Sequence, residues 1–122
     1  MKIYITNTNM LTYNQRDYLC SLALSSYFGD FIYVDDSPVT ICEVDGKMVG
    51  WASAALDWTI GVVVKTEYRG RGIGTQLVSL LLDYIPMDRE WECRPRYEYP
   101  QGKHMFEKII KEKSLEGKVF VN

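Results

Sequence analysis

The sequence predicts an α/β protein, a three-layer sandwich in which helices cover both faces of a mixed, mostly antiparallel sheet. Short runs rich in β-branched and aromatic residues alternate along the chain with stretches whose apolar residues recur at helical spacing. One run, residues 59–65, is apolar almost throughout, which is typical of a strand covered on both faces. No internal repeat, low-complexity tract or linker interrupts the 122 residues. We therefore expect residues 1–122 to form one domain around a single core.

The N-terminal part is predicted to form a strand followed by a helix. Residues 2–6 (KIYIT) alternate and are rich in β-branched side chains. Thr12, with Gln15 three residues later, makes a capping box that opens a helix. Gly29 is a natural end for this helix. Its buried face is expected to carry Leu19, Leu22, Ala23 and Tyr27.

A hairpin is predicted next. Residues 39–44 (VTICEV) and 48–56 (MVGWASAAL) are apolar runs on either side of the pair Asp45-Gly46. An Asp-Gly pair between two such runs is a strong signal for two antiparallel strands joined by a tight turn. The apolar strand at residues 59–65 then follows.

The second half is predicted to alternate helices with short strands. A helix that ends at Pro86 carries apolar residues at helical spacing, namely Leu77, Leu80, Leu81 and Tyr84. Residues 90–94 (EWECR) are predicted to form a strand, and residues 118–121 (KVFV) a short closing strand. Between them a last helix begins near Lys103, with Met105, Phe106, Ile109 and Ile110 on one face.

Charge is unevenly distributed along the chain. Residues 1–60 hold 3 Lys and Arg against 7 Asp and Glu, a balance of −4, whereas residues 61–122 hold 11 against 9, a balance of +2. With a sequence pI near 5.4 and no broad basic face, the chain is not predicted to bind nucleic acid. No charge-free apolar run approaches the ~18 residues of a membrane span, and the start of the chain lacks the apolar region of a signal peptide. We therefore expect no membrane association.

Cysteine usage indicates a reducing compartment. Cys20, Cys42 and Cys93 are scattered, odd in number and without CxxC spacing. This pattern does not predict a zinc site. We expect free thiols, no bound metal and a cytoplasmic location.

The stretch from Gly61 to Leu77, GVVVKTEYRGRGIGTQL, joins an apolar strand to an apolar helix through a turn of glycines and arginines. A helix N-terminus has unpaired N–H groups and the positive end of the helix dipole, so a turn that leads into it can hold an anion. Glycines at positions 70, 72 and 74 let a ligand approach the backbone closely, and Arg69 and Arg71 add positive charge. Together these features suit a pyrophosphate.

Two other phosphate-binding motifs match this turn less well. A Walker loop requires GK[ST] after its glycines, and that triplet is absent. The dinucleotide fingerprint GxGxxG needs a third glycine at position 75, where Thr75 stands, and no strand with an acidic end follows at the right distance. A strand, a short turn and RxxGxG at the start of a helix match without a gap, through Arg69, Gly72 and Gly74. A turn that only packs a helix against a strand would not need both arginines.

Here the chain resembles the GNAT superfamily of acetyl-CoA-dependent N-acyltransferases. Members commonly show a run such as V-x-V-x-x-x-x-R-G-x-G-I-G before an amphipathic helix. The residues that reproduce it are Val62, Val64, Arg69, Gly70, Arg71, Gly72, Ile73 and Gly74. The match is close over residues 59–84, and the order of elements agrees more loosely over residues 39–112.

The resemblance implies that acetyl-CoA is the cosubstrate. In the family, the strand that corresponds to residues 59–65 splays from the next strand, so the backbone groups of Val62 and Val64 would pair with the pantetheine arm. The side chains of Val62, Val63 and Val64 carry no polar group, which agrees with binding through the backbone. The turn would hold the pyrophosphate through residues Arg69, Gly70, Arg71, Gly72, Ile73, Gly74 and Thr75.

The family reaction is direct attack of an amine on the thioester, which implies a general base. A lysine-like amine is free only about once in a few thousand molecules at pH 7. The family usually draws the base from an acidic residue on the central strands, and Glu43 and Asp57 are the matching candidates here. Glu92, on the following strand, is a third. Each could instead be an ordinary surface carboxylate.

The general acid is the point at which this chain departs from the family. Members often carry a tyrosine in the helix after the fifth strand to protonate the leaving thiolate, whereas this chain has Phe106 there. Tyr97 and Tyr99 are the nearest phenols, and Tyr97 is the candidate we retain. His104 is more typical of a helix surface. Cys93 could relay an acyl group, but no neighbour in the sequence suggests a lowered thiol pKa.

The sequence therefore predicts an N-acetyltransferase that moves the acetyl group of acetyl-CoA to a primary amine. Two alternatives remain, a GNAT-like module that binds coenzyme A without turnover and an interaction protein that uses the fold as a scaffold. The acceptor is open between a protein lysine, an N-terminus and a small-molecule amine. An acidic loop with Asp30, Asp35 and Asp36 would suit a polyamine or basic peptide. Family members are often homodimers, so the resemblance also makes a homodimer possible.

Overall fold

The computed structural model describes residues 1–23, 26–55, 58–94 and 100–122. The strands are β1 (Lys2–Asn7), β2 (Pro38–Val44), β3 (Lys47–Ala55), β4 (Thr59–Val64), β5 (Trp91–Cys93) and β6 (Val119–Val121). The α-helices are α1 (Tyr13–Leu22), α2 (Ser26–Gly29), α3 (Ile73–Leu82) and α4 (Pro100–Glu112). Short 3-10 turns lie at η1 (Thr8–Met10), η2 (Asp30–Tyr33) and η3 (Thr66–Tyr68).

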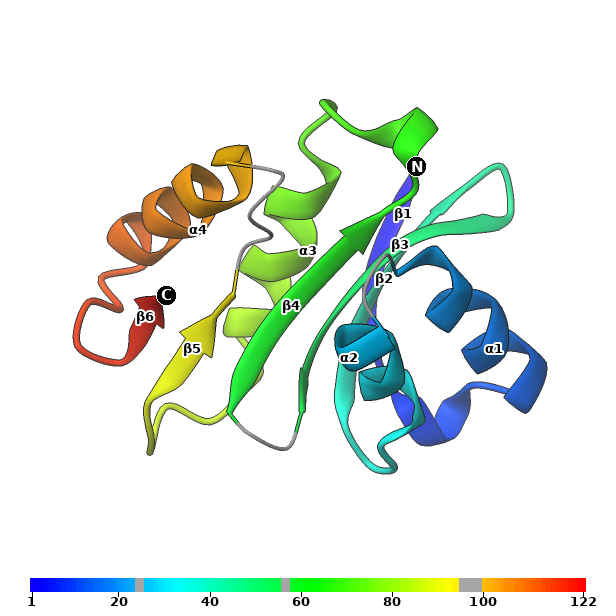
Figure 1. The fold of residues 1–122 in the computed structure, drawn as a ribbon, viewed down its shortest axis with the longest axis horizontal. Helices are drawn as coiled ribbons and strands as arrows, with labels where there is room; N and C mark the ends of the chain where they lie inside the picture. The colour runs from blue at the N-terminus through cyan, green and yellow to red at the C-terminus, as the bar shows by residue number, and fades with distance from the viewer. Residues whose placement is uncertain (24–25, 56–57, 95–99) are drawn as a thin grey trace.

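Within the described residues the strands form one 6-stranded sheet in the order β1-β2-β3-β4-β5-β6 (Figure 1). The pairs β1–β2, β2–β3 and β3–β4 are antiparallel, whereas β4–β5 and β5–β6 are parallel. Helix α3 makes the crossover between the parallel strands β4 and β5, as this connection requires. The predicted mixed, mostly antiparallel sheet is confirmed.

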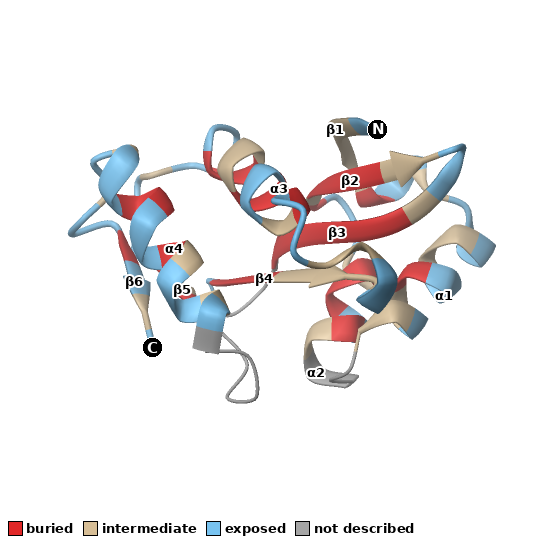
Figure 2. Cartoon of the chain, turned by 90° about the horizontal axis from the view of Figure 1, so that it is seen from above, coloured by how far each residue is buried: buried red, intermediate tan, exposed pale blue. Residues whose placement is uncertain are grey.

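Helices cover both faces of the sheet, which completes the predicted three layers. Helices α3 and α4 lie on one face, and α1 and α2 lie on the other (Figure 1). The α3–α4 core is built from residues such as Ile60, Leu77, Leu81, Phe106 and Ile109. The α1–α2 core is built from Leu19, Phe31, Ile32, Val39, Ile41 and Trp51. The side chains of β2 and β3 are mostly buried between these two layers (Figure 2).

Helix α1 begins as the sequence predicts and ends earlier than predicted. The Thr12 hydroxyl accepts from the Gln15 N–H at 3.1 Å, and the Gln15 side chain accepts from the Thr12 N–H at 2.9 Å, so the capping box is confirmed. The prediction that this helix runs to Gly29 is wrong, because the helix ends at Leu22 and the backbone of Ala23 is extended.

The early end of α1 has a packing reason. The separate short helix α2 lays the ring of Phe28 on the ring of Trp51, with centroids 4.5 Å apart and an interplanar angle of 15°. One continuous helix would carry Phe28 along the axis of α1 instead of turning it back onto the sheet. The predicted placement of Tyr27 lies outside the described side chains.

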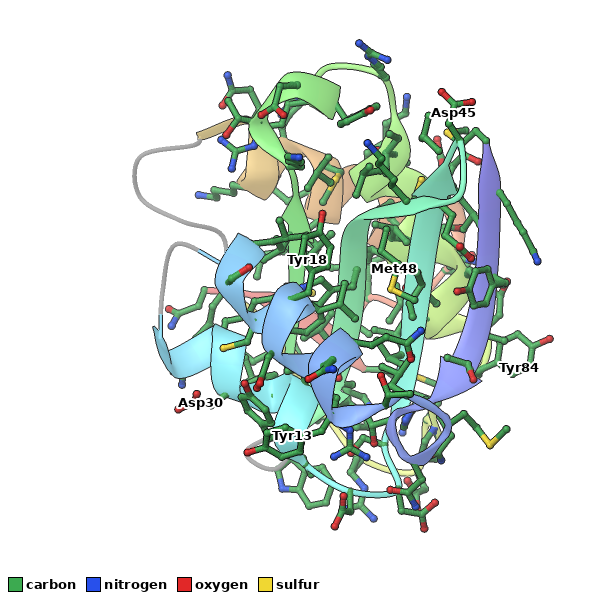
Figure 3. All side chains as sticks on the ribbon, turned by 90° about the vertical axis from the view of Figure 1, so that its right-hand side faces the viewer. Tyr13, Tyr18, Asp30, Asp45, Met48 and Tyr84 are labelled. Atoms are coloured by element: carbon green, nitrogen blue, oxygen red, sulfur yellow. The ribbon has the colours of Figure 1, made fainter. Side chains whose placement is uncertain are left out.

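Tyr13 and Tyr18 of α1 are both exposed large side chains (Figure 3). The Tyr18 hydroxyl donates to the carbonyl of Met48 in β3 at 2.9 Å. This bond ties the exposed side of α1 to the rim of the sheet.

Helix α3 also ends before the predicted position. It stops at Leu82, and Tyr84 is 62% exposed, so the prediction that Tyr84 lies on the buried face is wrong. The buried stripe of Leu77 and Leu81 continues instead to Ile85, whose N–H donates to the Leu81 carbonyl at 3.1 Å. The bond from Ile85 to Leu81 spans four residues, which keeps Ile85 on the same side as Leu77 and Leu81. Tyr84 points to solvent instead.

Helix α4 begins at Pro100, before the predicted start near Lys103. Proline is favoured in the first turn of a helix because the N–H that it lacks has no partner there. Phe106, Ile109 and Ile110 are buried as predicted, and Met105 is half-buried. In the described residues no helix is long and apolar enough to cross a membrane.

Candidate functional site

The parallel strands β4 and β5 pair only at their beginnings. The register joins Thr59 to Glu92 and Ile60 to Cys93, and β5 then ends, whereas β4 continues to Val64. Figure 1 shows β4 extending well beyond the end of β5. Burial changes at the same place, because Thr59, Ile60 and Gly61 are buried and the three following valines are half-buried (Figure 2). The prediction that this strand is covered on both faces is therefore correct only for the first half of β4.

The backbone of this second half of β4 presents its polar groups to the β5 side. Lys65 donates its N–H to the carbonyl of Val49 in β3 at 2.7 Å, which directs the odd-numbered residues of this stretch to β3. Backbone groups alternate along a strand, so the N–H and C=O groups of Val62 and Val64 point the other way. They face the space that opens beyond the end of β5.

A cleft of about 520 Å³ occupies this space. Its described lining residues come from the end of α1, β4, the turn before α3, the first turn of α3, Arg94 after β5, and α4. They include Arg69 and Arg94 and no carboxylate. The rest of the lining is mostly apolar or glycine, with Tyr68, Thr75 and Gln101 as polar members, so the cleft suits a long ligand with an anionic part.

The cleft is lined from both faces of the sheet. Val62 and Val64 pack on the α3–α4 core, whereas Val63 and Leu22 pack on the α1–α2 core. All four residues line the same cleft. The cleft therefore passes the edge of β4 from one face to the other.

The turn before α3 forms the anion-binding end of the cleft. Gly70 and Gly72 both have φ +79°, in the left-handed region that favours glycine, and open space surrounds the position of a Cβ at each. Gly72 is the N-cap of α3, and no side chain caps this end. The N–H groups of the first helical turn are the ones that lack an acceptor within the helix. They can therefore donate to an anion here.

The two arginines of the turn differ in placement. Arg69 donates from Nε to the Val64 carbonyl at 2.9 Å and lines the cleft. Arg71 lies over the ring of Tyr68, 5.1 Å from its centroid, and donates to the Glu67 carbonyl at 3.3 Å. Tyr68 lines the cleft, whereas Arg71 is not among its lining residues. The predicted residues that do line it are Val62, Val63, Val64, Arg69, Gly70, Gly72, Ile73, Gly74 and Thr75.

Gly74 lies where α3, α4 and β4 meet at the cleft. A Cβ at this position would lie 3.4 Å from the Met105 sulfur and 3.8 Å from Val64 Cγ2, which are ordinary van der Waals distances. Packing alone therefore does not require glycine at position 74, although alanine is the better helix former. A ligand bound against this part of the cleft would explain why position 74 carries no side chain.

The predicted acid and base residues are not gathered at the cleft by the described structure. Glu43 lies on β2, two strands from β4, and hydrogen-bonds with Tyr4. Burial, together with this bond, raises the pKa of the Tyr4 phenol. Asp57, Tyr97 and Tyr99 lie outside the described residues.

Glu92 is engaged in an ion pair. It accepts from Arg94 Nε at 2.8 Å and from Asn122 Nδ2 at 2.7 Å, both on the same carboxylate oxygen. The hydrogen bond from Arg94 is the largest cause that lowers the pKa of Glu92. A carboxylate with a lowered pKa is a weaker base, so Glu92 is suited to hold Arg94 in place.

The other residues that the sequence raised as candidates differ in burial. Phe106 is 2% exposed, lines the cleft and carries no proton to donate. Cys93 is fully buried, and burial raises the pKa of its thiol to about 12. His104 is exposed. Among the residues that the structure describes, no group of three or more His, Cys, Asp or Glu could hold a metal ion.

Sequence reasoning missed several lining residues. Leu22, Arg94, Gln101, Gly102 and Met105 belong to α1, the end of β5 and the first turns of α4. For Arg94 a signal did exist, since ligands often bind beyond the carboxyl ends of parallel strands. The others come from segments far from the turn in sequence.

Known proteins resemble this chain in sequence and in fold. The acetyltransferase (GNAT) family model matches residues 6–109. An uncharacterised N-acetyltransferase of Methanocaldococcus jannaschii is 42% identical over 48 residues, which are 36% of this chain and 31% of that protein. The chain thus aligns with about a third of this curated relative.

Two solved structures share the fold. The aminoglycoside N-acetyltransferase AAC(6')-Iy, in complex with CoA, has a TM-score of 0.59 at 17% identity and covers 88% of this chain and 89% of its own. A ribosomal-protein-alanine N-acetyltransferase from Brucella melitensis biovar Abortus 2308 has a TM-score of 0.55 at 17% identity, with 89% and 91% covered. At this identity the likeness establishes the fold alone.

Proposed function

The chain belongs to the acetyltransferase (GNAT) family, and from that premise we propose that it transfers the acetyl group of acetyl-CoA to a primary amine. The observation that carries the proposal is the cleft beside β4, which combines an uncapped helix start, Arg69 and the part of the β4 edge beyond its pairing with β5 in one continuous space. A coenzyme A molecule has a matching order of groups, with phosphates at one end and a pantetheine amide chain leading to the thioester.

The proposed placement follows the chemistry of the lining. The N–H groups of residues 70–75 and the guanidinium of Arg69 receive the pyrophosphate. The backbone groups of Val62 and Val64 pair with the amides of the pantetheine arm, as an added strand would, although the Val64 carbonyl also accepts from Arg69 Nε at 2.9 Å. The apolar side chains of Val62, Val64 and Met105 contact its methylene groups.

In the proposed reaction the acceptor nitrogen attacks the thioester carbon. The new C–N bond forms, the C–S bond breaks, and the ammonium proton leaves through a base. Asp57, just before β4, remains our proposed base, with Glu43 as the alternative, and Tyr97 remains the proposed donor to the departing thiolate. A cytoplasmic location and a homodimer also remain predictions.

Transfer from radiolabelled acetyl-CoA to a broad panel of amines and proteins tests the proposal. We expect labelled product with the wild-type chain and a loss of at least about tenfold in Arg69→Gln, because a charge-assisted hydrogen bond to phosphate is removed. Arg89→Gln is the matched control, since Arg89 lies over the ring of Trp58 and does not line the cleft. Its transfer rate should equal that of the wild type.

One outcome would replace the proposal. If acetyl-CoA binds and no member of the panel is acetylated, the chain is a coenzyme A-binding module without turnover. The phenyl ring of Phe106 in the cleft is the feature that motivates this alternative.

A further inference from the structure

The two edges of the sheet differ in how much strand they offer to a partner. At one edge, β6 is 3 residues long, and a short edge strand limits pairing with another chain. At the other edge, β1 is 6 residues long, contains no proline and keeps a continuous register with β2. Seen from above, β1 borders the molecule (Figure 2). Its outer side is therefore a regular strand edge.

The backbone direction along β1 follows from one hydrogen bond just beyond the strand. Thr8 donates its N–H to the Ser37 carbonyl at 2.9 Å, so these two residues form a hydrogen-bonded pair. Hydrogen-bonded and non-hydrogen-bonded pairs alternate along antiparallel strands, so the even-numbered residues of β1 direct their backbone groups to β2. Asn7 and Pro38 form a non-hydrogen-bonded pair, which agrees with the N–H that proline lacks.

The odd-numbered residues of β1 consequently direct their N–H and C=O groups to the outer side. These residues are Ile3, Ile5 and Asn7, and β2 is the only described strand that pairs with β1. Their side chains are half-buried, and Ile3 packs on the α3–α4 core. A row of outward-facing backbone groups beside apolar side chains is a template for another strand.

The two ends of β1 carry opposite charges. Lys2, at the start, is exposed and is the only charged residue of the strand. Asp36 is exposed beside the end of β1, where Asn7 donates from Nδ2 to its carboxylate at 3.0 Å. A second β1 that runs in the opposite direction would therefore meet complementary charge at both ends.

We propose that β1 pairs with β1 of a second copy of this chain, antiparallel and about a two-fold axis at Ile5. Around this axis Ile5 faces Ile5 of the second copy, and Ile3 faces Asn7 of the second copy. Each outward N–H then meets a C=O, and the two sheets become one continuous sheet. Such a contact is closed, because both copies contribute the same residues. This inference is independent of the proposed acetyl transfer.

The length of β1 decides where the axis lies. With the axis at Tyr4, Asn7 would face Met1 of the second copy, which lies outside the strand. With the axis at Ile5, the pairing runs from residue 3 to residue 7 in both copies. All the outward-facing residues are then paired within the strand.

The same axis keeps like charges apart. The two Lys2 residues lie about six residues apart along the joint, or about 20 Å at the rise of a strand. This separation exceeds the Debye length of about 8 Å at physiological ionic strength. Each Lys2 lies instead at the end where the other copy carries Asp36, so a two-fold dimer satisfies the charges that a single copy leaves at its edge.

Substitutions at the axis test this contact, because position 5 meets itself there. Ile5→Lys and Ile5→Glu each place two like charges opposite each other, so each should raise the dimer dissociation constant at least about fivefold. An equimolar mixture of the two variants should recover dimers, because lysine then faces glutamate. Sedimentation velocity over a range of concentrations measures the dissociation constant.

The opposite edge of the sheet supplies matched controls. Phe120 is 45% exposed on β6, so Phe120→Lys and Phe120→Glu introduce the same charges on the other edge strand. Neither should change the dissociation constant. Thermal unfolding and the affinity for desulfo-coenzyme A check that every variant is folded, since no residue of β1 or β6 lines the cleft.

Lys2→Glu tests the charge pattern at an exposed position, where the fold is not at stake. The new carboxylate would lie at the same end as Asp36 of the second copy, so the dimer should weaken about threefold or more. The effect should shrink at high salt, because exposed charges are then screened.

Amide hydrogen exchange of the wild-type protein tests the register residue by residue. The N–H groups of Ile3, Ile5 and Asn7 should be protected at concentrations that favour the dimer and should exchange faster after dilution. Those of Tyr4 and Thr6 face β2 and should be protected in both conditions. Equal exchange of the odd-numbered residues in both conditions would contradict strand pairing.

Three association results would also overturn the inference. The first is a wild-type protein that stays monomeric at every concentration. The second is a dimer that persists unchanged in folded Ile5→Lys and Ile5→Glu, which would place the interface elsewhere. The third is a dimer that dissociates only in the Phe120 variants, which would assign the interface to β6.

Discussion

Gly74 is a residue at which folding and binding make opposite demands. A methyl group there would meet Met105 and Val64 at ordinary contact distance, and a helix favours alanine over glycine by about 0.5–1 kcal/mol. We expect Gly74→Ala to raise the free energy of unfolding by roughly this amount. The same methyl group would project into the cleft, so the affinity for acetyl-CoA should fall at least about tenfold.

Denaturant unfolding and calorimetry on one protein sample measure both effects of Gly74→Ala. Gln76→Ala is the control on the same helix, because Gln76 is exposed and does not line the cleft. A Gly74→Ala protein that binds acetyl-CoA as tightly as the wild type would show that no ligand approaches this wall.

Cys93 illustrates how burial decides the chemistry of a residue that the sequence left open. With a pKa raised to about 12, its thiol is ionised in about one molecule in 10⁴ at pH 8. We expect Cys93 to resist iodoacetamide in the native protein and to react once the protein is unfolded. Peptide mapping by mass spectrometry identifies the modified positions. Rapid labelling of Cys93 in the native protein would contradict its burial, and the hypothesis that Cys93 relays an acyl group would then have to be reconsidered.

At the scale of an element, the turn before α3 can be compared with the β2–β3 hairpin turn, because each contains a glycine with nearly the same positive φ. Gly72 has φ +79° and Gly46, in the β2–β3 hairpin, has φ +77°, with open space for a Cβ at both. Alanine at either position should cost about 1–2 kcal/mol of stability through the left-handed backbone alone. Only Gly72→Ala should also weaken acetyl-CoA binding, because only this turn directs its N–H groups at the cleft.

The comparison between these two glycine variants separates strain from binding. Calorimetric titration gives the affinity, and thermal unfolding gives the stability. Equal acetyl-CoA affinities for Gly72→Ala and Gly46→Ala would mean that the turn only starts a helix.

The contact between α2 and β4 yields a second prediction at this scale. A Cβ at Gly61 would lie 2.4 Å and 2.5 Å from two ring carbons of Phe28. We expect Gly61→Ala to destabilise the protein by about 1–3 kcal/mol, because the ring must move off the strand. In a double-mutant cycle, Phe28→Leu should absorb part of this loss.

Denaturant titration of the two single variants and the double variant measures the coupling between positions 61 and 28. Simple additivity of the two losses would show that the ring does not rest on Gly61.

At the scale of the whole molecule, local signals predicted the order of elements well. The capping box at Thr12 and the Asp45-Gly46 hairpin are local, because the residues that decide them are neighbours in sequence. The end of α1 at Leu22 depends instead on the contact of Phe28 with Trp51, which is 23 residues away in sequence and could not be read from a helical pattern.

In the site, too, the part formed by one continuous segment was predictable from the sequence, and the part formed by long-range contacts was not. The turn with Arg69, Gly70 and Gly72 is one continuous segment, so its spacing in the sequence reports its geometry. The far end of the cleft depends on where β5 stops relative to β4, and a pairing register of two residues is not visible in composition or periodicity. The position of Arg94 after a parallel strand was a general signal, but its place in the cleft emerged only from the structure.

The family match spans residues 6–109, while the solved relatives named above act on different acceptors according to their names. The shared fold accordingly does not by itself identify the acceptor of this chain. Because the chain aligns with only about a third of its curated relative, each activity has to be tested directly on this chain.

The most direct test of the central claim is a calorimetric titration of the purified protein with acetyl-CoA and with desulfo-coenzyme A. The cleft beside β4 predicts affinities in the micromolar range, about −8 kcal/mol, for both ligands, because neither the phosphates nor the pantetheine amides differ between them. Absence of binding to either ligand would mean that the turn at Arg69–Gly74 only opens a helix, and the proposed acetyl transfer would be contradicted with it.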